Sequence, residues 1–213
     1  MLMMRNKTWI AIFAVLLVVG GFVYLTSQTS EIPRVTETQQ EEVETSVVTN
    51  GEISCSGEAT PALTEGPYYK AGSPERDNIA QGQIGEELVV EGYVLSTECE
   101  PISGAWIDFW QAGADGNYDN IGFNLRGHQY TDQMGRYRLE TVMPARYSGR
   151  TAHIHVKVRA NENSSVLTTQ LFFPDPPAGG QNQSDSIFNE ALVVDMQEAE
   201  EGNVASFNFI LPK

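Results

Sequence analysis

Gly135-Arg-Tyr-Arg-Leu-Glu-Thr-Val142 alternates polar with apolar side chains, and it follows a turn sequence, Asp132-Gln-Met-Gly. Alternation with a period of two is typical of a β-strand that buries one face and exposes the other. A helix of similar length would place its apolar residues three and four positions apart. This segment therefore predicts a strand that is entered through a tight turn.

The same period recurs on both sides of this segment, in stretches separated by clusters of Gly, Pro, Asn and Asp. Only Ser184 to Asp195 has a pattern compatible with a helix. Several short strands without alternating helices predict an all-β domain, an antiparallel β-sandwich. The other expected strands are Glu87 to Leu95, Ala105 to Trp110, Thr151 to Val158, Val166 to Phe173 and Val204 to Leu211.

The N-terminal part of the chain has a different character. Two basic residues precede an uncharged stretch from Thr8 to Thr26, which is about as long as a membrane span, and no convincing cleavage site follows it. We expect residues 1–26 to be a membrane anchor, with a cleaved secretory signal as the alternative. Because positive charge stays inside, the rest of the chain should be extracytoplasmic. Residues 27–54 are polar and acidic, as in a flexible linker, and residues 55–213 should form the folded domain.

The charge balance and the cysteines exclude several classes of protein. The chain has 28 acidic and 13 basic residues, which gives a net charge of −15. A nucleic-acid partner would require a clustered basic face, and the sequence contains none. The two cysteines, Cys55 and Cys99, are too few for a disulfide-framed miniprotein or a four-thiolate zinc site. Outside the cytoplasm they can form one disulfide bridge, and two buried free thiols are the alternative.

Two of the three histidines form His153-Ile-His155 on an expected strand. Residues i and i+2 project from the same face of a strand, so both imidazoles can reach one metal ion. Two exposed histidines without a metal are the alternative. No carboxylate is well placed beside them, whereas Tyr147 lies on the turn that enters this strand and Tyr118 lies in an earlier loop. Two tyrosinates with two neutral imidazoles suit Fe(III) better than zinc, because a phenol coordinates well only when a highly charged, hard cation ionises it.

Five segments between about Cys55 and Lys213 together resemble one protein family. They are Leu63-Thr-Glu-Gly-Pro-Tyr-Tyr69, Cys99 to Gln111 with Gly116-Asn-Tyr118, Arg126 to Gly135, Pro144-Ala-Arg-Tyr147 with Arg150-Thr-Ala-His-Ile-His155, and Thr169-Gln170-Leu-Phe-Phe. In these segments the chain resembles the intradiol ring-cleavage dioxygenases, and most of all the protocatechuate 3,4-dioxygenase type and its smaller exported relatives. The presence of all five segments in the order of the family makes the resemblance specific.

The resemblance implies a role for particular residues. It implies four ligands for a ferric ion, Fe(3+), with no organic cofactor; these are Tyr118, Tyr147, His153 and His155. Arg150 and Gln170 would stabilise negative charge on the activated substrate, and Arg150 would also contact it. Tyr147, as the axial ligand, would leave and take a substrate proton. Tyr68 matches a motif that lines the substrate mouth, and we expect the third histidine, His128, to be a strand residue with no role at the metal.

The activity that the resemblance implies is that of a non-haem Fe(III)-dependent intradiol dioxygenase of aromatic catabolism. With O2, such an enzyme cleaves a catechol-type ring between its two hydroxyl-bearing carbons and gives a muconate-type diacid. A sandwich module that binds a phenolic ligand or a protein without catalysis is one alternative, and a purely structural module without iron is another. Retention of all four ligand residues favours the enzyme. The oligomeric state is left open.

The chain departs from the family pattern near the expected metal ligands. Ala145 and Thr151 stand where the family has a glycine and a proline, and only two residues separate Tyr147 from Arg150. Protocatechuate enzymes carry a longer insertion there, which helps to shape their substrate pocket. The identity of the catechol therefore does not follow from the resemblance.

Overall fold

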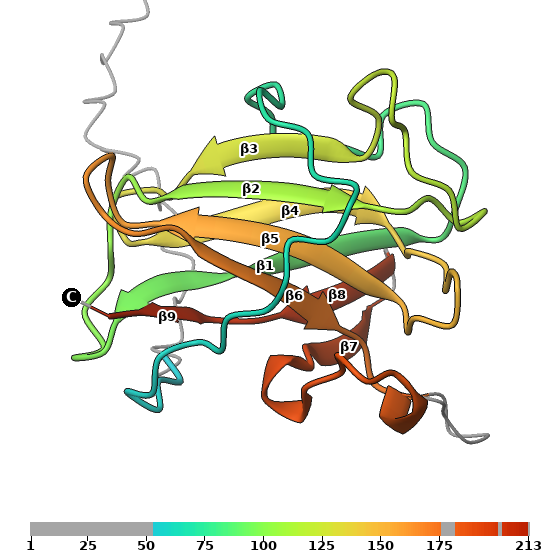
Figure 1. The fold of residues 1–213 in the computed structure, drawn as a ribbon. Coiled ribbons are helices and arrows are strands. Elements are labelled where there is room, and N and C mark those ends of the chain that lie inside the picture. Colours follow the sequence, from blue (N-terminus) through green and yellow to red (C-terminus); the bar gives the residue numbers. More distant parts are fainter. Residues whose placement is uncertain (1–52, 176–181, 200–201, 213) are drawn as a thin grey trace, which may run out of the picture. The chain divides into compact units, whose positions relative to one another are not determined.

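The computed structural model describes residues 53–175, 182–199 and 202–212, and these form strands joined by loops (Figure 1). The expected anchor, residues 1–26, and nearly all of the expected linker, residues 27–54, lie outside the described residues. Within the described part, no helix has the length and apolarity needed to cross a membrane. The elements in chain order are β1 (Glu87–Ser96), β2 (Trp106–Gln111), β3 (Arg126–Tyr130), β4 (Arg136–Val142), β5 (His153–Arg159), β6 (Leu167–Phe172), η1 (Asn182–Ser184), η2 (Glu190–Leu192), β7 (Asp195–Ala199), β8 (Gly202–Ser206) and β9 (Phe209–Leu211).

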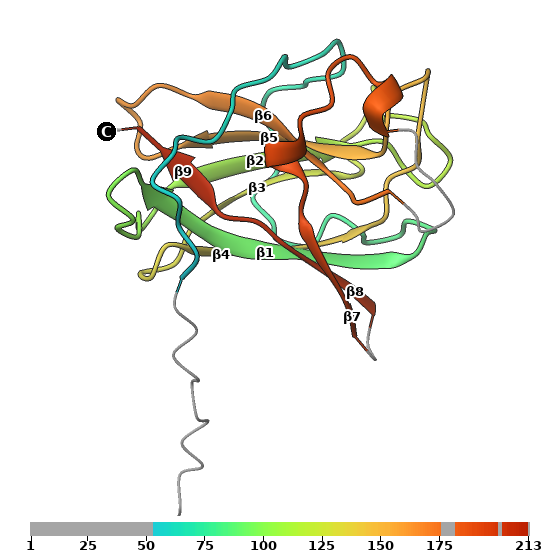
Figure 2. The same cartoon turned by 90° about the horizontal axis from the view of Figure 1, so that it is seen from below.

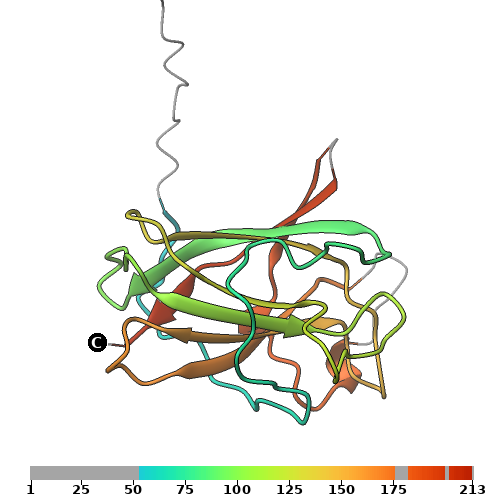
Figure 3. The same cartoon turned by 90° about the horizontal axis from the view of Figure 1, so that it is seen from above.

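The strands form two sheets that pack face to face (Figure 2). The four-stranded sheet has the order β3-β2-β5-β6, and every pairing in it is antiparallel. The five-stranded sheet has the order β4-β1-β8-β7, with β9 also paired to β1. The β7–β8 hairpin projects beyond the sandwich (Figure 3). The all-β fold expected from the sequence is therefore confirmed for the described residues.

The C-terminal strand differs from the expectation. Val204 to Leu211 was expected to be one strand of an antiparallel sandwich, but β8 and β9 both pair with β1 in parallel. The break falls at a close contact with β1, where a side-chain carbon added at Gly92 would lie only 1.9 Å from the Phe207 carbonyl oxygen. The two halves pair with separate parts of β1, Leu88–Glu91 and Val94–Ser96.

Two further differences concern local structure. The helix expected over Ser184 to Asp195 is wrong in extent, since this stretch holds only η2 and the end of η1, both single 3-10 turns, and Asp195 begins β7. Side-chain caps replace helical backbone bonds there, because Asp185 accepts from the Ile187 amide and Asn189 accepts from the Ala191 amide. The expectation that His128 is a strand residue is confirmed by β3, but the bounds of this strand were not predicted, because its sequence Arg-Gly-His-Gln-Tyr lacks the apolar alternation of a half-buried strand.

The apolar core lies between the two sheets and accounts for the period of two. In β5 the side chains of Ile154, Val156 and Val158 are buried in this core. The intervening residues of β5 consequently project from the opposite, outer face of the four-stranded sheet. A chain segment before β1 crosses that outer face (Figure 1), held by hydrogen bonds from the Leu63 amide to the Thr168 carbonyl and from the Arg76 amide to the His128 carbonyl, both 2.8 Å. We call residues 60–80 the strap.

Cys55 and Cys99 form a disulfide, with their Cα atoms 5.8 Å apart. This is the bridged alternative of the two that the sequence left open. It joins the chain just before the strap to the connection between β1 and β2. The bridge closes a sequence separation of 44 residues, so it restricts the unfolded chain considerably.

Candidate metal centre

The two histidines of β5 lie side by side beneath the strap. His153 is 2% exposed and His155 is 1% exposed. Their Nε2 atoms are 3.1 Å apart. Two nitrogens that each lie about 2.1 Å from one metal ion, at a right angle, would be about 3 Å apart. The pair therefore has the separation expected of two imidazole ligands on neighbouring positions of one ion.

Their protonation also suits metal binding. The Nδ1 atom of His153 lies 2.6 Å from the Thr151 carbonyl oxygen, so it carries the proton and leaves the Nε2 lone pair unprotonated. Burial lowers the pKa of His153 to about 4. Burial, and then the neighbouring His153, lowers the pKa of His155 well below its usual value. Both rings are consequently neutral at pH 7 and able to act as ligands.

A tight turn brings Tyr147 to the histidines. The backbone has φ of +47° at Ser148 and +76° at Gly149, and the Arg150 amide donates to the Tyr147 carbonyl at 2.7 Å. Two consecutive positive φ values are typical of the two-residue turns that join paired strands. The ring of Tyr147 lies 5.5 Å from that of His153, between centroids.

Tyr118 reaches the same place from the loop between β2 and β3. Its ring centroid is 5.2 Å from that of Tyr147 and 6.1 Å from that of His155. Its hydroxyl is buried and makes no hydrogen bond of normal geometry among the residues that the structure describes, although the Tyr147 phenol is near enough to act on it. Burial, and then the neighbouring Tyr147, raises the pKa of Tyr118 above its usual value. A buried hydroxyl without a partner is costly, and a metal ion would satisfy it.

The donor set fits a ferric ion. Two imidazoles and two phenols converge, and within the described ranges no three His, Cys, Asp or Glu side chains gather as a metal-binding group. Phenols become good ligands only when ionised, which a hard, highly charged cation favours. The residues that the sequence singled out as ligands are therefore brought together in an arrangement that Fe(III) suits.

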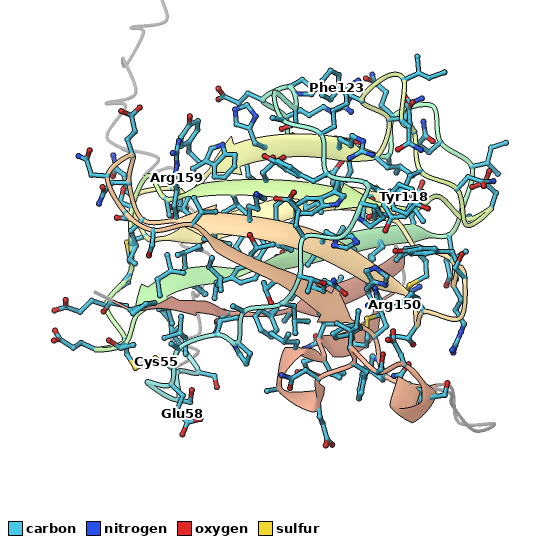
Figure 4. The ribbon with its side chains drawn as sticks, viewed as in Figure 1. Cys55, Glu58, Tyr118, Phe123, Arg150 and Arg159 are labelled. Atoms are coloured by element: carbon cyan, nitrogen blue, oxygen red, sulfur yellow. A yellow bond between two sulfur atoms is a disulfide. The ribbon has the colours of Figure 1, made fainter. Side chains whose placement is uncertain are left out.

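Arg150 lies beside this cluster, held on two sides. Its Nε donates to both carboxylate oxygens of Asp185, at 3.0 and 2.8 Å. Its Nη2 donates to Oε1 of Gln170 at 2.6 Å, and the Gln170 amide donates to the Thr64 carbonyl of the strap at 3.1 Å. Figure 4 shows Tyr118 and Arg150 at the same end of the four-stranded sheet. Arg150 and Gln170, which the sequence paired by resemblance, are thus in direct contact.

Tyr68 covers the phenols from the strap. Its ring stacks on that of Tyr118, with centroids 4.3 Å apart and planes 13° apart, and it meets Tyr147 edge-on at 5.9 Å. Gly66 lies over His155, since a side-chain carbon at this position would come within 3.3 Å of the His155 Cε1 atom. The strap therefore forms one wall of the site. His128 lies apart in β3, where its Nδ1 contacts the Ser73 carbonyl oxygen at 2.8 Å.

Three residues at the site were not identified from the sequence. Asp185 binds Arg150, the Trp110 ring stacks on His155 at 4.8 Å, and the buried Arg126 lies 6.0 Å from the Tyr118 ring. Trp110 is the cross-strand partner of both Arg126 and His155. If the strand order had been known, Trp110 and Arg126 could have been placed in the same row as His155. The sequence offers no such indication for Asp185, because it lies in a loop 35 residues from Arg150.

The comparisons with known proteins agree with this site. A family model described as "Dioxygenase" matches residues 64–212. The dioxygenase domain of a dioxygenase carbohydrate-binding protein fusion from Streptomyces sp. SirexAA-E has 42% sequence identity and a TM-score of 0.68, covering 73% of this chain and 99% of that domain. The chain belongs to the intradiol ring-cleavage dioxygenase family.

In two curated members of the intradiol ring-cleavage dioxygenase family, a smaller share of the relative's length is matched by this chain. The hydroxyquinol 1,2-dioxygenase of Rhizobium sp. (strain MTP-10005) is 33% identical over 176 residues, which is 69% of this chain and 58% of that protein. The catechol 1,2-dioxygenase of Acinetobacter baylyi is 30% identical, and 54% of its length is matched. The chain thus spans little more than half the length of these relatives. An intradiol ring-cleavage dioxygenase from Tetranychus urticae has 25% identity and a TM-score of 0.65, with 94% of that chain covered.

Proposed function

We propose that this protein is a ferric intradiol dioxygenase, which uses O2 to cleave a catechol-type ring between its two hydroxyl-bearing carbons and gives a muconate-type diacid. The observation that carries the proposal is the convergence of two neutral imidazoles, with Nε2 atoms 3.1 Å apart, and two phenols, one of which has a buried hydroxyl without a partner. Membership of the intradiol family supports the reaction class.

The four donors would hold Fe(III) in unequal ways. His153, His155 and Tyr118, whose hydroxyl is buried, would be the permanent ligands, because their rings are packed on several sides. Tyr147 is half-buried, as Tyr118 is, but it adjoins the exposed two-residue turn Ser148-Gly149, so its phenol would have more freedom to leave and to accept a proton from a substrate hydroxyl at Oη. When bound, Fe(III) would supply a Lewis acid and a template for the catechol and O2.

The surrounding residues would orient the substrate and stabilise its charge. Arg150 carries a positive charge that acts on Tyr118 and on both histidines, and Asp185 and Gln170 fix its direction. A guanidinium held in this way would stabilise the anionic ring that develops as the catechol loses its protons. Tyr68 would contact the substrate from the strap, since it already faces both phenols.

The substrate class is a catechol, and its ring substituents are left unassigned. The relatives named for hydroxyquinol and catechol support a small dihydroxylated ring. The two-residue turn between Tyr147 and Arg150 replaces the longer insertion expected in protocatechuate enzymes. Fewer residues would therefore cover the substrate entrance on the side of Tyr147.

We further propose that the domain, residues 55–213, works outside the cytoplasm, tethered through residues 1–26. The disulfide between Cys55 and Cys99 supports this location, because such bridges persist in oxidising compartments. Intact-mass measurement of the processed protein would distinguish a retained anchor from a cleaved signal.

The proposed function is tested by iron content and the visible spectrum of the full chain, before and after anaerobic addition of catechol. We expect one ferric ion and a broad tyrosinate-to-iron band that shifts when catechol is added, followed by ring cleavage when O2 is admitted. Tyr118→Phe should lose most of the band, whereas the control Tyr130→Phe, at an exposed position of β3, should keep it. A chain that takes up no iron after reconstitution, yet binds catechol, would be a binding module instead.

A further inference from the structure

Arg126 is a buried arginine that forms no ion pair among the residues that the structure describes. It begins β3 and is 1% exposed. Its Nε donates to the Asp119 carbonyl oxygen at 3.0 Å, but Nη1 and Nη2 are buried without a hydrogen-bond partner among the described residues. Burial lowers the pKa of Arg126, although a guanidinium keeps its proton at pH 7. This positive charge is thus hidden from solvent and forms no ion pair within the described ranges.

The nearest carboxylates are engaged elsewhere. Asp119 uses its carboxylate to accept from the backbone amides of its own loop, and Asp108 accepts from the hydroxyls of Ser73 and Tyr69. Neither lies within ion-pair distance of Arg126 in the described part of the chain, although the negative charges of both act on it from farther away. A buried charge of this kind is strongly unfavourable unless an opposite charge is present for at least part of the protein's working cycle.

The opposite charge is available at Tyr118. The guanidinium carbon of Arg126 lies 6.0 Å from the centroid of the Tyr118 ring. Arg126, Trp110 and His155 form one row across three neighbouring strands, so the guanidinium is fixed on the side of the site where Tyr118 approaches His155. None of the described contacts joins Arg126 to Tyr147. Of the two phenols, Arg126 therefore contacts only Tyr118.

We propose that Arg126 is the charge-compensating residue of the metal centre, and that its unpaired guanidinium stabilises Tyr118 as an anionic ligand of Fe(III). This rests on the ligand set of the proposed function. It also explains why Tyr118 would be a permanent ligand and Tyr147 an exchangeable one, although both are phenols. Tyr118 is paired with a fixed positive charge and stays on the metal, whereas Tyr147 lacks this contact and is the ligand that exchanges.

The expected size of the effect follows from the distance. If the guanidinium and phenolate charges are separated by about as much as the guanidinium carbon and the ring centroid, 6.0 Å, then in a medium with an effective dielectric constant of about 20 they interact strongly enough to change a binding constant by about a hundredfold. In the metal-free protein the substitution should have the opposite effect on stability. Replacing an unpaired buried charge by an apolar side chain of similar length removes the desolvation cost of that charge. The same substitution should thus weaken ferric binding and leave the metal-free protein as stable as before, or more so.

The test compares Arg126→Met, Arg126→Lys and the control Arg159→Met in the full chain. Arg159 also packs on an aromatic ring of the four-stranded sheet, but this ring is Trp106, away from the donors. Thermal unfolding is measured without metal, and affinity for Fe(III) and for Ga(III) is measured by competition with nitrilotriacetate. For Arg126→Met we expect an unchanged or higher melting temperature, about hundredfold weaker binding of both ions, and a tyrosinate-to-iron band at longer wavelength. Arg126→Lys should recover most of the affinity, and Arg159→Met should not change it.

A lower melting temperature with unchanged affinity would overturn the proposal and make Arg126 a structural residue only. If Arg126→Met does not fold, Arg126→Gln removes the charge while keeping a donor for the Asp119 carbonyl, and the same affinity criterion decides. Failure of the proposed function has a different signature. In that case the unmodified chain itself takes up no ferric ion. If only this inference fails, the unmodified chain binds the ferric ion and the Arg126 variants bind it with the same affinity.

Discussion

Replacing Asp185 should disable Arg150 without touching any of the four donors. Arg150 Nε and the Asp185 carboxylate are 2.8 Å apart, and their side chains are 18% and 1% exposed. Removal of one partner from a buried pair costs about 3–5 kcal/mol, and because Arg150 keeps some solvent contact we expect about 3 kcal/mol for Asp185→Ala. For a domain of this size that lowers the melting temperature by roughly 6–12 °C.

The effect on catalysis should exceed what the loss of stability explains. With Asp185 absent, Arg150 keeps only its bond to Gln170, and a misplaced guanidinium should lower kcat by about a hundredfold with a smaller change in KM. The control is Asn189→Ala, which removes the cap of η2 in the same loop, costs about 1 kcal/mol and leaves kcat unchanged.

Asp185 accepts hydrogen bonds from the Thr151 amide as well as from Arg150, so a double-mutant cycle decides whether its effect on kcat passes through Arg150. In an Arg150→Met background, Asp185→Ala should lower kcat no further, because the group that it orients is gone. Steady-state kinetics are measured at a temperature where all four proteins are folded. If the two substitutions lower kcat multiplicatively, Asp185 has an independent role and the proposed positioning is refuted.

Three further substitutions test the fold and its pH dependence. Burial alone would raise the pKa of Asp185, but hydrogen bonds from the Thr151 amide and from Arg150 outweigh it and hold this pKa below its usual value. The stabilisation by Asp185 is therefore present above pH ~4 and lost as pH falls through the folded pKa, so the difference in unfolding free energy between wild type and Asp185→Asn should narrow in acid denaturant titrations. Gly92→Ala should cost about 3 kcal/mol or prevent folding, because its methyl would lie 1.9 Å from a carbonyl oxygen; a loss below about 1 kcal/mol in urea titration would contradict this contact. Cys55→Ser should cost about 4 kcal/mol by loop entropy, and an equal stability of oxidised and reduced protein would count against that figure.

The parts of the site that could be predicted from the sequence depend on local geometry. His153 and His155 share a face because strand residues two apart must do so, whatever the rest of the fold. The same period places Ile154 in the core, which the structure confirms. The four donors could be named, in addition, because their surrounding motifs resemble those of a known family.

The parts that could not be predicted depend on contacts between distant segments. The parallel pairing of β8 and β9 with β1 joins residues more than 100 positions apart, and no periodicity encodes it. Arg126 was overlooked for a different reason, since an arginine in a polar stretch is normally exposed, and here it is 1% exposed. Asp185 could not be found because the loop that delivers it to Arg150 has no regular period.

One cross-strand register produces both the core and the candidate metal centre. Arg126, Trp110, His155 and Gln170 occupy successive strands of the four-stranded sheet in one row, so their side chains project from the same outer face. A slip of β5 by one residue would turn His155 into the core and bring Ile154 or Val156 beneath the strap. The burial of Ile154, Val156 and Val158 opposes such a slip with the full hydrophobic contribution of three side chains. The histidines are therefore held in position chiefly by the apolar residues that alternate with them, and core substitutions in β5 should weaken metal binding even though they touch no donor.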